Sequence, residues 1–223
     1  MTYSYFSARL FADREDAAQR LAQALSQYRG KHPLVLAIPR GAVPMGRILA
    51  QELEGELDVV LVRKLGAPFN PEFAIGAIDE SGWTYLSDER AGADDAYLRD
   101  EKSAQLDIMH ARRRAYTPGR GPIDPAGRVA IVVDDGLATG ATMIAALHAV
   151  RARKPARLVC AVPVAARDSL RLVAPNADET VCLYQPEDFF AVSRFYASFP
   201  QVEDEQVVAA LRASDEARAA HPS

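Results

Sequence analysis

Apolar residues along this 223-residue chain follow two patterns: short continuous runs, and spaced positions that recur every three or four residues. Continuous runs are typical of strands buried on both faces, and spaced positions are typical of amphipathic helices. The runs predict strands at residues 34–38, 57–63, 129–133, 158–164 and 179–184. The spaced positions predict helices at residues 13–28, 42–54, 94–116, 140–152 and 167–173.

The order of these elements predicts the fold class. Strands that alternate with helices and are hydrophobic throughout indicate an α/β fold, in which a parallel sheet is flanked by helices on both faces. A short hairpin is expected at 73–78 and 83–86. Gly and Pro residues predict a loop at 64–70. We expect a single domain over residues 1–223 with its core at 34–184.

Two parts are expected in addition to this core. The long charged helix at 94–116 forms a helical insertion, and a segment rich in Pro and Gly at 117–127 ends it. The aromatic-rich residues 185–213 form a C-terminal hood or tail that ends in another helix.

Composition narrows the class of partner. The formal net charge of −4 and the isoelectric point near 5.6 give no reason to expect nucleic acid as a partner. The first 30 residues carry no continuous apolar segment, so neither a signal peptide nor a membrane span is expected. The two cysteines lie in apolar runs, which favours free thiols and a cytoplasmic location.

The segment with the clearest chemistry is residues 132–143, VVDDGLATGATM. An apolar run ends in Asp134 and Asp135, and small residues then open a helical pattern. Ligands of parallel sheets bind beyond the carboxyl ends of the strands. Carboxylates bind sugar hydroxyls or a cation, and the N–H groups at a helix start bind a phosphate. The segment therefore predicts a ribose phosphate ligand.

Two other kinds of site give a similar pattern. The Walker B strand of an ATPase also ends in acidic residues, but it requires a G-x-x-x-x-G-K-[ST] segment, and none of the four lysines lies in one. A simple Thr-Gly helix cap after a core strand is the other alternative, and these residues alone leave it open.

The sequence VVDDGLATGAT resembles the phosphoribosyl diphosphate-binding motif of type I phosphoribosyltransferases, over a matching region of about residues 34–184. It is most similar to the adenine phosphoribosyltransferases, which also carry an Ala-Thr-Gly loop. The resemblance implies that Asp134 and Asp135 contact the ribose 2′- and 3′-hydroxyls and, through water, a Mg²⁺ ion. It also implies a loop that binds the 5′-phosphate, formed by Ala138, Thr139, Gly140, Ala141 and Thr142.

Two further segments resemble the same family. Pro39, Arg40 and Gly41 follow the first predicted strand, where family members contact the diphosphate, and a glycine permits close backbone approach to a ligand. Arg63 and Lys64 resemble the Arg-Lys-x-Gly region of the adenine enzymes. An ordinary turn with a surface arginine, and a solvent-facing lysine, are the alternatives for these two segments.

The acceptor base is less well defined. The 6-oxopurine enzymes place an Asp at the position of Ala138, so their mechanism is disfavoured. Adenine enzymes use a Glu, for which Glu72 and Glu80 are candidates, although each could equally be a solvated loop charge. Segment 186–192 loosely resembles the hood of 6-oxopurine enzymes, which gives Phe189 the role of stacking on the base. The alternative is that the aromatic residues of this tail cover the sheet edge.

These resemblances imply an enzyme that transfers a phosphoribosyl group from phosphoribosyl diphosphate to a small nitrogenous base, with a purine-like base favoured. The two carboxylates, with Lys64 and Arg40, would be catalytic, and Mg²⁺ would be the cofactor. One alternative is a regulatory protein that senses the sugar diphosphate, and another is hydrolysis of the activated sugar. The run of three arginines at 112–114 is expected to be solvated, with a partner-binding or lid role as the alternative. A homodimer is one candidate for the oligomeric state, which the sequence leaves open.

Overall fold

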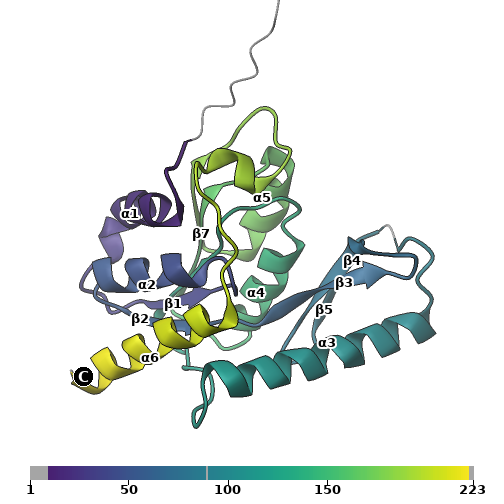
Figure 1. Ribbon diagram of the computed structural model, residues 1–223, viewed down its shortest axis with the longest axis horizontal. Coiled ribbons are helices and arrows are strands. Elements are labelled where there is room, and N and C mark those ends of the chain that lie inside the picture. Colours follow the sequence, from purple (N-terminus) through teal and green to yellow (C-terminus); the bar gives the residue numbers. More distant parts are fainter. Residues whose placement is uncertain (1–9, 89, 221–223) are drawn as a thin grey trace, which may run out of the picture.

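The body of the protein is built on a parallel sheet of five strands in the order β2-β1-β6-β7-β8 (Figure 1). The computed structural model describes residues 10–88 and 90–220. The strands are β1 (Leu34–Ala37), β2 (Glu56–Val59), β6 (Val129–Val133), β7 (Arg157–Val164) and β8 (Glu179–Tyr184). Strands β1, β6, β7 and β8 agree with predicted strands to within one residue at each end, and the predicted α/β fold class is confirmed.

Helices cover both faces of this sheet because each strand presents apolar side chains on both sides. Val35 and Ala37 of β1 pack with the helices on one face, and Leu34 and Leu36 pack on the other. The first face carries α1 (Arg14–Ala24), α2 (Val43–Glu52) and α6 (Asp204–Ala220). The second face carries α4 (Ala141–Arg151) and α5 (Arg167–Val173). Three 3₁₀ turns are η1 (Ser26–Tyr28), η2 (Ala174–Asn176) and η3 (Val192–Phe195).

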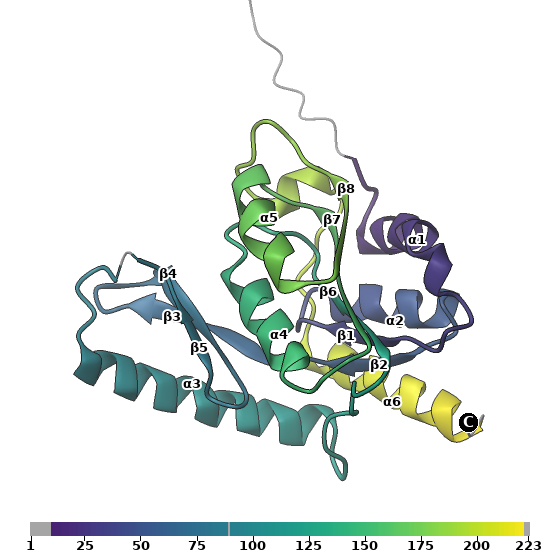
Figure 2. The ribbon, with the colours of Figure 1, turned by 180° about the vertical axis from the view of Figure 1, so that it is seen from behind.

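An antiparallel sheet and the longest helix form a second unit, here called the arm, which projects from the body in Figures 1 and 2. Its strands are β3 (Val62–Ala67), β4 (Asn70–Asp79) and β5 (Thr84–Leu86), and its helix is α3 (Asp95–Tyr116). The carboxylate of Asp94 caps α3 by accepting a bond from the N–H of Tyr97 (2.8 Å). The arm packs on α4, where Trp83 stacks on His148 with their ring centroids 3.5 Å apart.

The arm corrects two predictions. The apolar run predicted as one strand at 57–63 is divided, since β2 ends at Val59 and β3 begins at Val62. The loop predicted at 64–70 is wrong, because most of it belongs to β3 and to the start of β4. Its glycine, Gly66, lies in the strand where the β3–β4 register shifts. The predicted hairpin at 73–78 and 83–86 is confirmed as part of β4 and β5.

Residues 10–12, at the N-terminal end of the described chain, pair with residues 195–198, which precede α6. Phe11 forms an isolated bridge with Tyr196, and their rings lie 5.3 Å apart. The predicted C-terminal helix is present but extends from Asp204 to Ala220, beyond its expected end. Among the helices in residues 10–88 and 90–220, none is long and apolar enough to cross a membrane.

Candidate functional site

Two adjacent carboxylates lie at the tip of β6, at the edge of the sheet where its parallel strands end. The N–H of Asp135 donates to the Asp134 carboxylate (2.9 Å), so the backbone itself orients the first of the pair. Burial raises the pKa of Asp134 well above its usual range, and the nearby charge of Asp135 raises it further. Burial also raises the pKa of Asp135. This edge therefore concentrates negative charge in a poorly solvated place.

Arg14, the first residue of α1, is the main cationic partner of this pair. Its Nε and Nη2 donate to Asp135 Oδ2 at 3.0 and 2.9 Å, and its charge opposes the rise in the pKa of Asp135. Its guanidinium lies 3.6 Å from the centre of the Phe199 ring, and its Nη1 donates to the carbonyl of Pro200 (2.7 Å). Sequence reasoning missed Arg14, because a charged residue at the start of an amphipathic helix gives no signal of a partner 121 residues away.

Gly41 lies directly against the acidic pair. A Cβ atom at this position would lie 2.2 Å from Asp135 Oδ2, so only glycine leaves room for the carboxylate. Gly41 was predicted to leave space for a ligand. In the structure this space is filled by the Asp135 carboxylate, which would itself face the ligand. The loop that carries it follows β1 and contains a cis peptide between Pro39 and Arg40.

The loop from Ala138 to the start of α4 is held in place by its neighbours. The Ser169 hydroxyl donates to the carbonyl of Ala138 (2.5 Å), and Gly140 adopts a left-handed conformation (φ +80°) as it caps α4. The first bond inside α4 runs from the N–H of Ile144 to the carbonyl of Gly140 (2.9 Å). The preceding N–H groups therefore point out of the helix start, while Ala138 and Thr139 are exposed to solvent.

Lys64 and Arg63 occupy opposite sides of strand β3. Lys64 is exposed and pairs with Ala77, which packs on Ala141 and Ala145, so Lys64 lies on the side of β3 that faces α4. Its charge lowers the pKa of Asp134. Arg63 lies on the side of α3, where its Nε donates to Gln105 Oε1, and burial lowers its pKa. Successive side chains of a strand point to opposite faces, so these two neighbours are separated. Lys64 lies near the acidic pair, and Arg63 lies on the opposite face.

Arg40 also points away from the acidic pair. Its Nη1 lies 3.4 Å from Glu203 Oε2 and 3.8 Å from Asp204 Oδ2, at the start of α6. The strand-end loop after β1 therefore contributes Gly41 to the site, whereas its charged side chain contacts the C-terminal helix.

The assembled edge thus holds two half-buried carboxylates and a helix start with free N–H groups, with a lysine of the arm close enough to lower the pKa of Asp134. A model of the phosphoribosyl transferase domain matches residues 9–198, which include all of these groups. The chain belongs to the phosphoribosyl transferase domain family. This family match confirms the phosphoribosyltransferase resemblance that was predicted from residues 132–142.

Relatives of this phosphoribosyl transferase domain agree in sequence and in fold. Two curated proteins from Mycobacterium tuberculosis, strains CDC 1551 and H37Rv, are each 45% identical over 206 residues, and their names give phosphoribosyl transferase as an unproven activity. The match covers 91% of this chain, and the chain spans about half (46%) of the length of those relatives. The crystal structure of TT1426 from Thermus thermophilus is 44% identical and covers 92% of this chain and 98% of that one, with a TM-score of 0.78.

The hood of this phosphoribosyl transferase domain differs in detail from the prediction. Phe189 is half-buried and packs on Phe195, with ring centroids 5.5 Å apart. Phe190 is 73% exposed, with the Arg194 guanidinium 4.9 Å from its ring centre. The aromatic tail therefore partly covers the sheet edge, as the alternative interpretation expected, and presents Phe190 rather than Phe189 to solvent.

The two glutamate candidates lie elsewhere or are not described. Glu80 forms an ion pair with Arg113 of α3 (2.6 Å), and the side chain of Glu72 lies outside the described residues. Arg113 also donates to the carbonyl of Val59 (3.0 Å) and lies 3.4 Å from buried Asp58. The prediction of a solvated arginine run is therefore wrong for Arg113, which connects the arm to the body.

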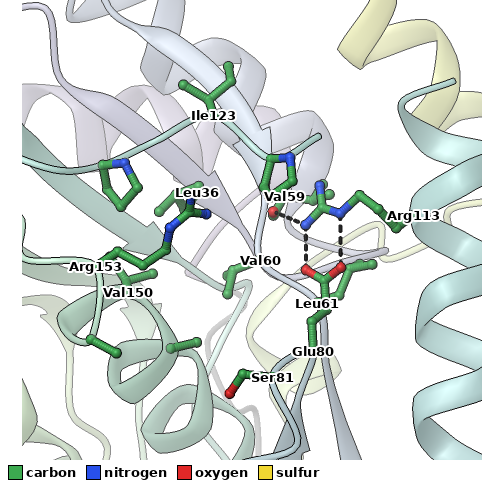
Figure 3. Close-up of a pocket in the computed structure, with 14 residues that line it drawn as sticks. Leu36, Val59, Val60, Leu61, Glu80, Ser81, Arg113, Ile123, Val150 and Arg153 are labelled. Atoms are coloured by element: carbon green, nitrogen blue, oxygen red, sulfur yellow. Dashed lines mark hydrogen bonds and ion pairs between the residues drawn. The ribbon is translucent and has the colours of Figure 1, made fainter. Parts of the chain in front are cut away.

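A cavity of about 320 Å³ lies beside this connection and not at the acidic pair (Figure 3). Its walls include Leu36, Val60, Ile123 and Val150, with the Arg113–Glu80 ion pair at one side, and they contain neither carboxylate of the pair nor any residue of the phosphate loop. Within the described residues, the chemistry of the family motif is concentrated at the sheet edge and not in this cavity.

Proposed function

We propose that the chain transfers a phosphoribosyl group from phosphoribosyl diphosphate to a nitrogenous base and releases diphosphate. The observation that carries the proposal is the meeting of two half-buried carboxylates with a helix start at one sheet edge. The carboxylates suit ribose hydroxyls, and the N–H groups at the start of α4 suit the 5′-phosphate. Family membership supports phosphoribosyl transfer as the class of reaction.

Each group then has a defined role. Asp134 and Asp135 hold the 2′- and 3′-hydroxyls and so fix the ribose ring for attack at its anomeric carbon. The loop from Ala138 to Thr142 binds the 5′-phosphate at the far end of the same sugar. The bond from the anomeric carbon to diphosphate breaks as the ring nitrogen of the base forms the new bond, and positive charge develops on the sugar ring.

Stabilisation of the departing diphosphate falls to Lys64 and to the backbone of residues 39–41. Lys64 is the predicted cation that faces the acidic pair, and its flexible chain can reach a phosphate oxygen. Arg40 and Arg63 were predicted to share this role. Their contacts with Glu203 and Gln105 mean that either must change partner before it can reach the leaving group.

The acidic pair fits the magnesium ion that this reaction would use. Mg²⁺ prefers oxygen ligands and is commonly bound by one or two carboxylates together with substrate phosphates and water. Among the described residues no group of three or more His, Cys, Asp or Glu could hold a metal alone, which agrees with a metal that arrives with its substrate. The two desolvated carboxylates, whose pKa values are raised, would hold Mg²⁺. The bound ion would neutralise negative charge on the diphosphate.

The proposed acceptor is a purine-like base. A 6-oxopurine is disfavoured, because the enzymes that use one have an Asp at the position of Ala138. The hood offers Phe189 and the more exposed Phe190 as aromatic faces for stacking. Stacking selects flat rings without naming the base, so the choice of base is left to experiment.

Diphosphate release tests this function directly. The protein is incubated with phosphoribosyl diphosphate, Mg²⁺ and each of a panel of purine and pyrimidine bases. We expect release with at least one base, and loss of release in the Asp134→Asn/Asp135→Asn variant. The Asp100→Asn/Asp107→Asn variant removes the same two charges from exposed positions of α3 and should behave as wild type.

The outcomes separate the proposal from its alternatives. Binding of the sugar diphosphate without release in the presence of any base would favour a sensing protein of the same fold. Release that is independent of base would indicate hydrolysis. Unchanged release in the Asp134→Asn/Asp135→Asn variant would refute the assignment of the pair.

A further inference from the structure

The Arg14–Asp135 contact is more than a surface ion pair. The Arg14 side chain is 11% exposed and that of Asp135 is 16% exposed. Arg14 reaches three partners from two parts of the chain: the carboxylate after β6, and the Phe199 ring and Pro200 carbonyl of the C-terminal segment. A guanidinium held by stacking and by bonds in its plane has little freedom to turn. Its orientation is therefore fixed before any ligand arrives.

Both bonds from Arg14 to Asp135 end on the same oxygen. Oδ2 accepts from Nε and from Nη2, and the same oxygen fills the space that Gly41 leaves beside the backbone. The Arg14 guanidinium and the Gly41 backbone thus both contact one side of this carboxylate. Neither the Arg14 bonds nor the Gly41 contact involves its other oxygen, Oδ1.

The C-terminal segment holds this arrangement from the opposite side. The Tyr196 hydroxyl donates to the backbone carbonyl of Asp135 (2.7 Å), so both the main chain and the side chain of Asp135 are tied to residues 196–200. The side-chain connection passes through Arg14. Helix α1 and the C-terminal segment therefore meet at a single carboxylate of the proposed ribose site.

We propose that Arg14 is the positioning residue of the ribose site and that, held by Phe199 and Pro200, it sets the direction in which the Asp135 carboxylate faces the sugar. This inference rests on the proposed function. It gives the N-terminal helix, which lies outside the core at residues 34–184, a role in recognising the substrate. Arg14 acts through Asp135 and does not itself bind the sugar.

The test compares Arg14→Met with Arg14→Lys. Methionine keeps much of the length and removes the charge and the bonds, whereas lysine keeps the charge without the planar fork. For Arg14→Met we expect the KM for phosphoribosyl diphosphate to rise about tenfold or more, while kcat and the KM for the base change by less than about threefold. Arg14→Lys should recover part of the lost affinity.

Arg20→Met is the matched control. Arg20 lies on the same helix, pairs with Asp16 (2.8 Å) and lies over the Phe11 ring, but it has no contact with the acidic pair. Its KM should equal that of wild type. A purely structural role for Arg14 would lower the active fraction and kcat with KM unchanged, and that result would overturn the proposal.

A second variant and a structural readout keep the test decisive. If Arg14→Met does not fold, Gly41→Ala keeps the Arg14 side chain and displaces the same oxygen directly, since the added Cβ would lie 2.2 Å from Asp135 Oδ2 and 3.2 Å from Arg14 Nη2, and it should raise the same KM. If wild type binds no phosphoribosyl diphosphate, the proposed function fails, and crystal structures decide the role of Arg14. A moved Asp135 carboxylate in Arg14→Met or Arg14→Lys, with Arg20→Met unchanged, supports positioning. An unmoved carboxylate in the Arg14 variants overturns it.

Discussion

At the scale of single residues, the site depends on how closely Gly41 approaches Asp135. No side chain fits between the loop after β1 and the carboxylate, since a Cβ atom would lie 2.2 Å from Oδ2. Glycine at this position is therefore required by the acidic pair itself. The sequence indicated that Gly41 belongs to the site, but only the structure shows which group needs the space.

Gly41→Ala should accordingly weaken the binding of phosphoribosyl diphosphate about tenfold or more, because the methyl group displaces one carboxylate of the pair. Isothermal titration in the presence of Mg²⁺ measures this affinity. Gly121→Ala is the control, since a Cβ at Gly121 meets nothing within 4 Å. Equal affinities for the two variants would contradict the account of Gly41.

The raised pKa of Asp134 predicts that Asp134→Asn makes the protein more stable although it loses activity. Because its folded-state pKa lies above the ordinary 3.8, ionised Asp134 opposes folding at neutral pH, and this penalty disappears as pH falls through the folded pKa. Asp134→Asn should therefore raise the Tm of the ligand-free protein at neutral pH, by about 2–4 °C for each kcal/mol recovered.

Thermal unfolding between about pH 8 and about pH 4 tests this effect, with the gain from Asp134→Asn expected to shrink towards acid pH. Asp178→Asn gives the opposite comparison. The pKa of Asp178 is lowered by its bonds to Arg151 and to the N–H of Leu158, so its ionised form favours folding above the ordinary pKa. That variant should lower the Tm at neutral pH. A lowered Tm for Asp134→Asn would contradict the burial argument.

At the scale of elements, the arm is positioned by α3 through Arg113. This residue donates twice to Glu80 of the β4–β5 turn and once to the carbonyl of Val59 at the end of β2. It also neutralises Asp58, which is fully buried and otherwise relies on Arg120 (3.0 Å) and backbone N–H groups. The arm that carries Lys64 is thereby attached to the main sheet.

Arg113→Met should destabilise the fold by about 2–3 kcal/mol, because it removes the partner of Glu80 and one of the two cations beside buried Asp58. The measurement is chemical unfolding in urea at neutral pH. Arg114→Met changes the next residue of the same helix, which is exposed, and should alter stability by less than about 0.5 kcal/mol. Equal stability of the two variants would show that the Arg113 network does not stabilise the fold.

The elements of the body could be predicted from the sequence, and those of the arm only in part. Strands β1, β6 and β7 are continuous apolar runs because both faces are buried, and this pattern is unambiguous. Strand β3 carries exposed Lys64 beside half-buried Arg63, and its Gly66 lies at a register shift. Such a half-solvated strand has the composition of a loop, which is why residues 64–70 were wrongly predicted.

At the scale of the whole molecule, the proposed site draws on both ends of the chain. Asp134, Asp135 and residues 138–142 could be predicted because a local motif contains them. Arg14 and Phe199 could not, since each is an ordinary residue locally and acquires a role only when α1 and residues 196–200 meet at Asp135. The opposite orientations of Arg63 and Lys64 likewise depend on which face of β3 meets α3.

Ligand binding should stabilise the whole molecule if the site is formed in this way. At a concentration of phosphoribosyl diphosphate about 100 times its Kd, binding adds about 2.7 kcal/mol. For a chain of this size the Tm should rise by about 5–10 °C. Removing Mg²⁺ with a chelator should abolish most of the shift, and the Asp134→Asn/Asp135→Asn variant should show none. A full shift without divalent metal would argue against a metal held by the pair.

The most direct measurement of the central claim is a crystal structure of the protein with phosphoribosyl diphosphate and Mg²⁺. We expect the ribose 2′- and 3′-hydroxyls within hydrogen-bond distance of Asp134 and Asp135. We also expect the 5′-phosphate on the N–H groups at the start of α4. A sugar diphosphate bound elsewhere, for example in the cavity beside Arg113, or one bound in the opposite direction, would contradict the central claim.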